Sequence, residues 1–289
     1  MSVLVNKKTK IMVQGITGTQ ASFHIQRAMK YGTKIVAAVV PTSKEKSHLG
    51  VPIFNTVKEA KEKTGANASI VFVPAQTAKN AIIEAIDADL ELVVVITSGI
   101  PVADMMKIKH RLKKSKTILI GPNTPGIITT KEAYMGIFPD NILTSGPIGV
   151  ISKSSTLTYE IVLELNKVGL GQSTVIGLGD DYIIGSDFVD VIEKFNDDPK
   201  TKATVLVCGI GGNYEIDVAQ KYASLKNKKP IVALIVDGVE LASKTMIDTS
   251  ETMCYGLLSA SEKKDVLEDA GIIVVDTIQA LKDELKKIC

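Results

Sequence analysis

The chain has 289 residues, more than one doubly wound domain needs, and its 34 basic and 32 acidic side chains leave a formal net charge of only +2. This length predicts two compact α/β units, and the balanced charge argues against general binding of nucleic acid. No apolar run approaches the roughly 20 residues of a membrane span, and we expect neither a membrane segment nor a signal peptide after Met1.

The three cysteines, Cys208, Cys254 and Cys289, are widely spaced and form no C-x-x-C pair. This spacing predicts neither a zinc site nor a disulfide framework. It favours a reduced, cytoplasmic compartment, and we expect no metal site on this chain.

In the first half of the chain, short β-branched runs alternate with stretches of helical periodicity. That pattern is typical of parallel strands buried on both faces and connected by helices. We predict strands over residues 10–13, 35–39, 69–73, 92–96 and 117–120. Helices are predicted between them, over residues 20–30, 57–63, 77–88 and 102–113.

A stretch rich in glycine and proline, from residue 122 to residue 147, interrupts this alternation and predicts a connector with a short hairpin. We therefore expect one domain over residues 1–125 and a second over 126–289. The alternation then restarts, with strands predicted over residues 148–152, 174–178, 204–207, 231–236 and 272–275. A second sheet, Rossmann-like or flavodoxin-like, follows from that pattern.

The first strand runs into the loop Gln14–Gln20, which carries Gly15 and Gly18 and leads into a helix. Backbone N–H groups and a helix N-terminus at this position favour a phosphate-bearing ligand, although any strand-to-helix turn needs glycines. The loop is not G-x-G-x-x-G, which disfavours NAD and an NAD-linked dehydrogenase. Two later loops, at residues 73–75 and 96–101, are expected at the same carboxyl edge of the sheet.

In the second half, Ser154 and Ser155 stand between a strand and a helix and are suited to cap that helix. The same geometry also holds an anion, because the cap, the unpaired N–H groups and the helix dipole act together. The histidines, His24, His48 and His110, are predicted on the first helix, in a polar loop and on a later helix. We expect structural or solvated roles for all three, with His24 the most buried and hydrogen-bonded.

Read together, a collinear set of motifs resembles the alpha subunits of succinyl-CoA synthetases, nucleoside-diphosphate-forming acyl-CoA ligases. These motifs lie at residues 14–20, 23–24, 31–34, 48–50, 52–56, 121–126 and 152–160. The resemblance runs to about residue 212 and continues more faintly to the C-terminus. It implies an N-terminal Rossmann-like CoA-binding domain followed by a C-terminal flavodoxin-like ligase domain.

The resemblance also implies roles for particular residues. The substrate carboxylate would lie near Asn123 and Thr124, a phosphoryl group near Ser154 and Ser155, and Tyr159 near the contact with a β subunit. That β subunit, of ATP-grasp fold, would supply the nucleotide site and Mg²⁺. The CoA cleft would be lined by Thr17, Gly18, Thr19, Gln20, Ser43, Lys44, Val73, Pro74, Thr97, Ser98 and Gly99.

Two positions depart from the pattern of the family. The family carries its phosphoryl group on a histidine, and an ungapped count from Pro230 puts Asp248 at that place. The glutamate that orients this histidine is matched by Gly209. The resemblance therefore predicts an alpha subunit that joins CoA to a small dicarboxylic acid such as succinate, with ATP or GTP as the nucleotide. The alternative is a catalytically impaired paralogue that binds CoA or the β subunit in a regulatory role.

Overall fold

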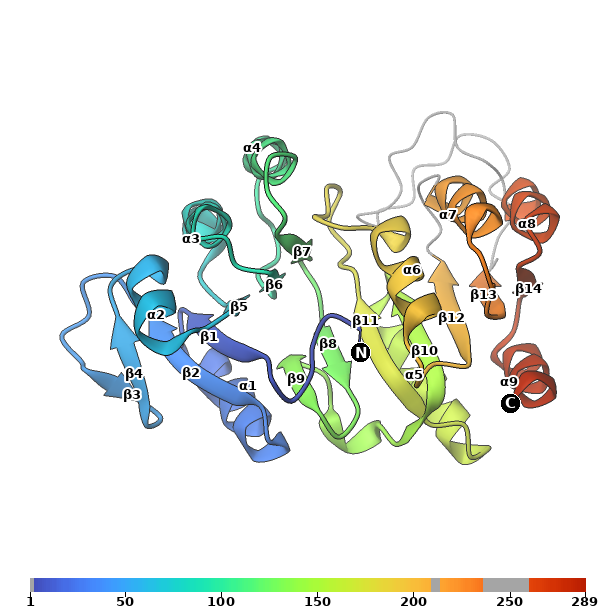
Figure 1. Cartoon of the computed structure of the whole chain (residues 1–289), viewed down its shortest axis with the longest axis horizontal. Coiled ribbons are helices and arrows are strands. Elements are labelled where there is room, and N and C mark those ends of the chain that lie inside the picture. Colours follow the sequence, from blue (N-terminus) through green and yellow to red (C-terminus); the bar gives the residue numbers. More distant parts are fainter. Residues whose placement is uncertain (1–2, 209–213, 236–259) are drawn as a thin grey trace. The chain divides into compact units, whose positions relative to one another are not determined.

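The computed structural model describes residues 3–208, 214–235 and 260–289 (Figure 1). Two compact units divide the chain. The N-terminal unit contains Leu4–Asp140 and the segment Ile183–Ser186, and the C-terminal unit contains Asn141–Tyr182 and Asp187–Cys289 together with Met1–Val3. The domain boundary expected between residues 125 and 126 stays a prediction.

The N-terminal unit is built on one largely parallel sheet. Its parallel strands are β1 (Lys10–Gln14), β2 (Lys34–Val39), β4 (Val51–Phe54), β5 (Ala68–Val71), β6 (Leu92–Val95) and β7 (Ile118–Ile120). They lie in the order β4-β2-β1-β5-β6-β7, and the two-residue strand β3 (Ser47–His48) pairs antiparallel with β4 at the edge. Counted along the chain, the parallel strands follow the Rossmann order 3-2-1-4-5-6, so the strand order reverses between β1 and β5.

Four helices connect these strands: α1 (Thr19–Tyr31), α2 (Val57–Thr64), α3 (Ala75–Asp87) and α4 (Val102–Leu112). Every strand and helix predicted for this half is present, with ends that differ by at most two residues, whereas the pair β3 and β4 was not predicted. Local signals set the helix ends, since Thr56 caps α2 by accepting from the N–H of Glu59 and Gly32 ends α1 with φ of 98°.

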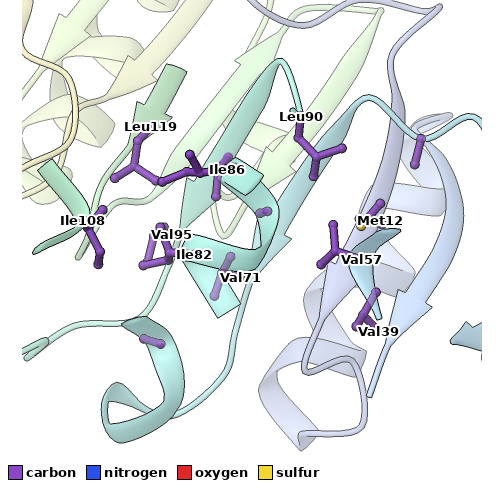
Figure 2. Packing of buried hydrophobic residues seen from close by; sticks show 14 of the residues in the cluster. Met12, Val39, Val57, Val71, Ile82, Ile86, Leu90, Val95, Ile108 and Leu119 are labelled. Carbon is purple, nitrogen blue, oxygen red and sulfur yellow. The ribbon is translucent and has the colours of Figure 1, made fainter. Parts of the chain in front are cut away.

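One hydrophobic core of this unit lies between a face of the sheet and the helices α2, α3 and α4. Figure 2 shows Val71 and Val95 from the strands near Ile82 of α3, and Met12 of β1 near Val57 of α2, all at most 1% exposed. Burial of each such side chain stabilises the fold by roughly 1.5–3 kcal/mol. The β-branched strands are therefore held in place, and with them the loops that leave their carboxyl ends.

The C-terminal unit has five parallel strands in the order β11-β10-β12-β13-β14. They are β10 (Ser145–Ser152), β11 (Gln172–Gly177), β12 (Ala203–Cys208), β13 (Ile231–Ile235) and β14 (Ile273–Val275). This is the flavodoxin-like order 2-1-3-4-5, which reverses between β10 and β12. The expected combination of a Rossmann-like and a flavodoxin-like unit is thus confirmed.

Five helices belong to the C-terminal unit: α5 (Ser155–Lys167), α6 (Phe188–Asp197), α7 (Tyr214–Ser224), α8 (Ala260–Asp269) and α9 (Ile278–Ile288). Helix α5 packs beside α9, while α7 packs against both α6 and α8 (Figure 1). Among the described residues, no helix combines the length and apolar character that crossing a membrane would require.

The glycine-rich connector contains the predicted hairpin, formed by β8 (Gly126–Thr129) and β9 (Ala133–Gly136), and a short 3-10 helix at Asp140–Ile142. The hairpin is tied to the end of α1, because the Tyr134 N–H donates to the Thr33 hydroxyl at 2.9 Å. Farther along, Arg27 on α1 forms an ion pair with Asp140.

A short return segment, Ile183–Ser186, also belongs to the N-terminal unit. The Gly185 N–H donates to the Gly121 carbonyl at 2.7 Å, and the Gly185 carbonyl accepts from Lys109 Nζ at 2.8 Å. A Cβ at Gly185 would lie 2.4 Å from the Leu119 carbonyl oxygen, so only glycine fits this approach.

Candidate functional site

The candidate CoA residues gather at the carboxyl edge of the N-terminal sheet, where the order of strands reverses between β1 and β5. Gly15 follows β1 with φ of +86°, and a Cβ there would lie 3.1 Å from the Val73 backbone N and 3.0 Å from Val73 Cγ1. Only glycine adopts this conformation without strain while allowing so close an approach. The loop after β1 therefore packs directly on the loop after β5.

The N-terminus of α1 is open at this edge. Gly18 is the N-cap, with φ of −67° and no side-chain capping bond, and the first turn of α1 carries no acidic residue. Thr17, Gly18, Thr19 and Gln20 are all exposed. The unpaired N–H groups of a first turn and the positive end of the helix dipole favour an anion, so this loop has the features of a phosphate site.

Hydrogen bonds join the remaining loops of this edge to one another. The Thr97 hydroxyl donates to the Val73 carbonyl at 2.6 Å, and the Asn123 N–H donates to the Thr97 carbonyl at 2.9 Å. Thr124 is buried and accepts from the Gly126 N–H at 2.8 Å. The candidate CoA residue Val73 and the candidate substrate residue Asn123 are thus linked through Thr97.

Other candidate residues lie in the turns beside these. Pro74 is the N-cap of α3 and is exposed, and Ser98 and Gly99 are exposed in the turn before α4. In the loop after β2, Ser43 Oγ accepts from the Glu45 N–H at 3.1 Å. Lys44 is exposed and forms no ion pair within the described residues.

His48 links the loop after β2 to α1 through a contact that was not predicted from the sequence. Its Nε2 lies 2.8 Å from Ser22 Oγ, and the Ser22 hydroxyl donates to the Ile16 carbonyl at 2.9 Å. Since the Ser22 proton is used there, His48 Nε2 is the donor. The short strand β3 thereby ties the loop after β2 to α1, and His48 is not in the polar loop that we expected.

His24 differs from expectation in one respect. Its side chain is half-buried, but the buried Nδ1 has no hydrogen-bond partner among the described residues, so the expectation of a hydrogen-bonded His24 was wrong. Burial, and then the charge of Arg27, lower its pKa below the ordinary value of 6.5. His24 is therefore held in its neutral form near pH 7, against the Phe72 ring.

The second group of candidate residues lies at the start of α5 in the C-terminal unit. Ser154 is the N-cap, accepts from the Leu157 N–H at 3.4 Å and has its own N–H bonded to Ser152 Oγ at 3.0 Å. Ser155 is the first helical residue, and the first turn contains no acidic residue. Tyr159 is half-buried, and burial raises its pKa. Asp248 and Gly209 lie outside the described residues.

Lys153, immediately before this cap, was not singled out from the sequence. It is only 8% exposed, and its Nζ lies 4.3 Å from the centroid of the Tyr214 ring at the start of α7. Among the described residues no group of three or more histidine, cysteine or acidic side chains could hold a metal ion.

Two family models match the chain. One, described as a CoA binding domain, covers residues 6–99, and the other, described as CoA-ligase, covers residues 151–287. The candidate CoA residues, from Thr17 to Gly99, lie within the first matched region, and Ser154, Ser155 and Tyr159 lie within the second.

Among curated proteins, the chain is similar to the Succinate--CoA ligase [ADP-forming] subunit alpha of Staphylococcus epidermidis, with 47% identity over 277 residues, covering 96% of this chain and 91% of that protein. The protein of the same name from Aquifex aeolicus is 45% identical over 290 residues, covering 100% of this chain and 95% of that protein.

Among solved structures, the chain is similar to ATP citrate lyase from Methanothrix soehngenii in complex with citrate and coenzyme A, with a TM-score of 0.85 and 23% identity. The similarity covers 99% of this chain but only 50% of the lyase, so the chain spans half its length. A dinucleotide-forming acetyl-coenzyme A synthetase of Ca. Korarchaeum cryptofilum gives a TM-score of 0.79 at 20% identity, covering 96% of this chain and 60% of that chain. At these identities the likeness concerns the fold.

Proposed function

The chain belongs to the family of succinate–CoA ligase alpha subunits, and on that premise we propose that it joins CoA to a small dicarboxylic acid such as succinate. The reaction forms a nucleoside diphosphate. The observation that carries the proposal is the open N-terminus of α1. The loop before this helix packs through Gly15 on Val73, at the edge where the strand order reverses. That position in an open parallel sheet is where ligands bind.

In the proposed complex, the CoA phosphates bind at Thr17, Gly18, Thr19 and Gln20, where the N–H groups of Thr19 and Gln20 belong to the open first turn of α1. The exposed ammonium of Lys44 adds positive charge, and Ser43 lies beside it. Val73, Pro74 and the turn Thr97–Gly99 line the rest of CoA. The contacts among these loops exist without a ligand, so little ordering is needed when CoA binds.

The acid substrate is proposed to lie at Asn123 and Thr124, which the bond from Asn123 N–H to Thr97 holds beside the CoA residues. During the reaction the carboxylate takes a phosphoryl group to form an acyl phosphate, and the CoA sulfur then displaces phosphate. The N-terminus of α5 at Ser154 and Ser155 stabilises the negative charge of the phosphoryl group.

A β subunit completes the proposed enzyme, since the relatives are named as alpha subunits. We propose that this partner has an ATP-grasp fold, supplies the nucleotide and Mg²⁺, and contacts this chain near Tyr159. We also propose that the reaction takes place in the cytoplasm, because the few, widely spaced cysteines favour a reduced compartment.

One sequence feature favours a second candidate function. Asp248 and Gly209 stand where the family has its phosphorylated histidine and the glutamate that orients it. A paralogue that binds CoA or the β subunit without turnover would retain every feature described for the N-terminal unit. Turnover of succinate, CoA and nucleotide by the chain with its β partner separates the two functions.

The binding part of the proposal is tested by two substitutions at Gly18. Gly18 has φ of −67°, and a Cβ there would come no closer than 3.8 Å to its neighbours, so Gly18→Ala fits without strain. Gly18→Asp also preserves the helix, because aspartate is a preferred N-cap residue. Its carboxylate, however, would occupy the phosphate site and repel CoA.

Isothermal titration of the full chain with CoA should give similar affinities for wild type and Gly18→Ala. Gly18→Asp should bind CoA at least about tenfold more weakly, a loss of about 1.4 kcal/mol, which a like-charge contact in a partly desolvated site readily supplies. Absence of CoA binding by the wild-type chain, alone and with its β partner, would refute the proposal. Equal affinities of all three proteins would place CoA elsewhere.

A further inference from the structure

The imidazole of His48 lies between the two loops that carry the proposed CoA phosphate residues. On one side its Nε2 lies 2.8 Å from Ser22 Oγ on α1. On the other side its Nδ1 lies 3.8 Å from Glu45 Oε2, in the turn that also contains Lys44. The side chain of His48 is only 26% exposed, so the contact with Ser22 is partly shielded from water.

Ser22 passes this contact on to the backbone of the loop before α1. Its N–H donates to the Gly18 carbonyl at 2.8 Å, and its hydroxyl donates to the Ile16 carbonyl at 2.9 Å. Ile16 precedes the N-cap Gly18, so its carbonyl lies outside the hydrogen bonds of the helix itself. Ser22 therefore fixes the backbone on both sides of Thr17.

The direction of the bond between Ser22 and His48 follows from the proton count. A hydroxyl has one proton, and the Ile16 carbonyl takes it, so the Ser22 oxygen accepts from His48 Nε2. A nucleophilic serine would instead give its proton to the imidazole. The series Ser22, His48 and Glu45 is thus a support for the loop and not a nucleophile with its base.

The backbone holds His48 in place for this contact. His48 pairs with Val51 in the antiparallel ladder of β3 and β4, and the Ile53 N–H donates to the Lys46 carbonyl at 2.9 Å. The Glu45 side chain is 63% exposed, so its pairing with His48 adds little. The bond to Ser22 is therefore the main side-chain contact through which His48 acts.

We infer that His48 is a positioning residue for CoA, which acts through Ser22 and the Ile16 carbonyl to hold the loop before α1 in its binding conformation. A loop that is already held loses less conformational freedom when a ligand binds. The inference rests on the proposed function in taking this loop as the CoA phosphate site. His48 itself makes no contact with CoA in this arrangement.

Two amide substitutions at His48 test the inference. The amide nitrogen of glutamine reaches about as far as the imidazole Nε2, whereas that of asparagine is one methylene shorter and reaches only to the place of Nδ1. In isothermal titration of the full chain with CoA, His48→Gln should stay within about threefold of wild type. His48→Asn and Ser22→Ala should each weaken CoA binding by about tenfold, as expected for loss of one partly shielded hydrogen bond.

Combining the two losses distinguishes an indirect role from direct contact with CoA. Because His48 acts through Ser22, the double variant His48→Asn with Ser22→Ala should bind CoA no more weakly than Ser22→Ala alone. Independent contributions would instead multiply to a loss of about a hundredfold. That result would overturn the inference, because His48 would then contact CoA itself.

Hydrogen exchange of the amides at residues 17–20, measured on the chain without CoA, gives a readout that needs no ligand. Exchange should be faster in His48→Asn and as in wild type in His48→Gln. His110→Asn, which changes an exposed histidine on α4, is the control and should alter neither exchange nor CoA affinity.

Unchanged exchange in His48→Asn, or wild-type CoA affinity in that folded variant, would overturn the inference. If His48→Asn does not fold, wild-type CoA affinity in Ser22→Ala would overturn it instead. Failure of the proposed function gives a different pattern, in which CoA does not bind the wild-type chain while the dependence of loop exchange on His48 persists.

Discussion

Replacing Gly15 by alanine should damage both the N-terminal unit and its affinity for CoA. Gly15 combines φ of +86° with contacts of 3.0–3.3 Å from a would-be Cβ to Val73 and Phe72. Gly32, which ends α1, offers a matched control because its φ is +98° and a Cβ there would meet no atom within 4 Å. Both substitutions impose the same backbone strain, and only Gly15→Ala adds a steric conflict.

The expected loss of stability is the sum of the backbone strain and the steric conflict. A left-handed conformation costs a residue with a Cβ about 1–2 kcal/mol, which is the whole effect expected for Gly32→Ala. Overpacking adds about 1–3 kcal/mol, so Gly15→Ala should destabilise the unit by about 2–5 kcal/mol. The conflict falls on the Val73 backbone N, which has little freedom because the Val73 carbonyl accepts from Thr97.

Hydrogen exchange of the β1 and β5 amides, measured by mass spectrometry, reports the stability of this unit separately from that of the C-terminal unit. Exchange should be accelerated more in Gly15→Ala than in Gly32→Ala. Titration with CoA should show weaker binding only in Gly15→Ala, because the displaced Val73 lines the proposed site. Equal exchange rates and equal CoA affinities in the two variants would refute this reasoning.

Two further predictions concern the C-terminal unit. Bonds from Lys167 and Lys282 lower the pKa of Glu164 from 4.5 to about 2, so the stability contributed by this carboxylate is fully present above pH 4.5 and is lost as the pH falls toward 2. The melting temperature of wild type should therefore approach that of Glu164→Gln over this range, and a constant difference would contradict the pairing. With nucleotide, Mg²⁺ and the β partner, the chain should form no alkali-stable, acid-labile phosphohistidine. A hydroxylamine-sensitive label that is lost in Asp248→Asn would instead identify an aspartyl phosphate. Absence of both label and turnover would favour the impaired paralogue. A label on any of the three histidines would contradict the prediction.

Strands and helices could be predicted where local sequence decides the structure. The run Leu92–Val95 is entirely apolar and β-branched after its first residue, and all of it is buried, as parallel strands covered on both faces require. Strand β5 was predicted two residues too long, to residue 73. The chain leaves the sheet after Val71 because Val73 packs against Gly15 and Pro74 begins the turn into α3.

Features that depend on distant residues were not predicted. Strand β3 consists of Ser47 and His48, which have no strand signal of their own and are held by pairing with β4 and by the contact with Ser22. Lys153 was not singled out from the sequence. Its ammonium lies over the ring of Tyr214, which is far along the chain, and the order of strands brings the two together. The Gly15 loop was found because a strand, two glycines and a helix follow one another directly.

The return segment Ile183–Ser186 bears on how the protein is made. During synthesis on the ribosome, all seven strands of the N-terminal sheet emerge well before this segment does. Until then the Gly121 carbonyl and the Lys109 ammonium lack their bonds to Gly185, and Leu119 lacks its cover. The unit that folds first on the nascent chain is therefore completed only after part of the next unit has been translated, and a fragment ending at Asp140 would keep it in that unfinished state.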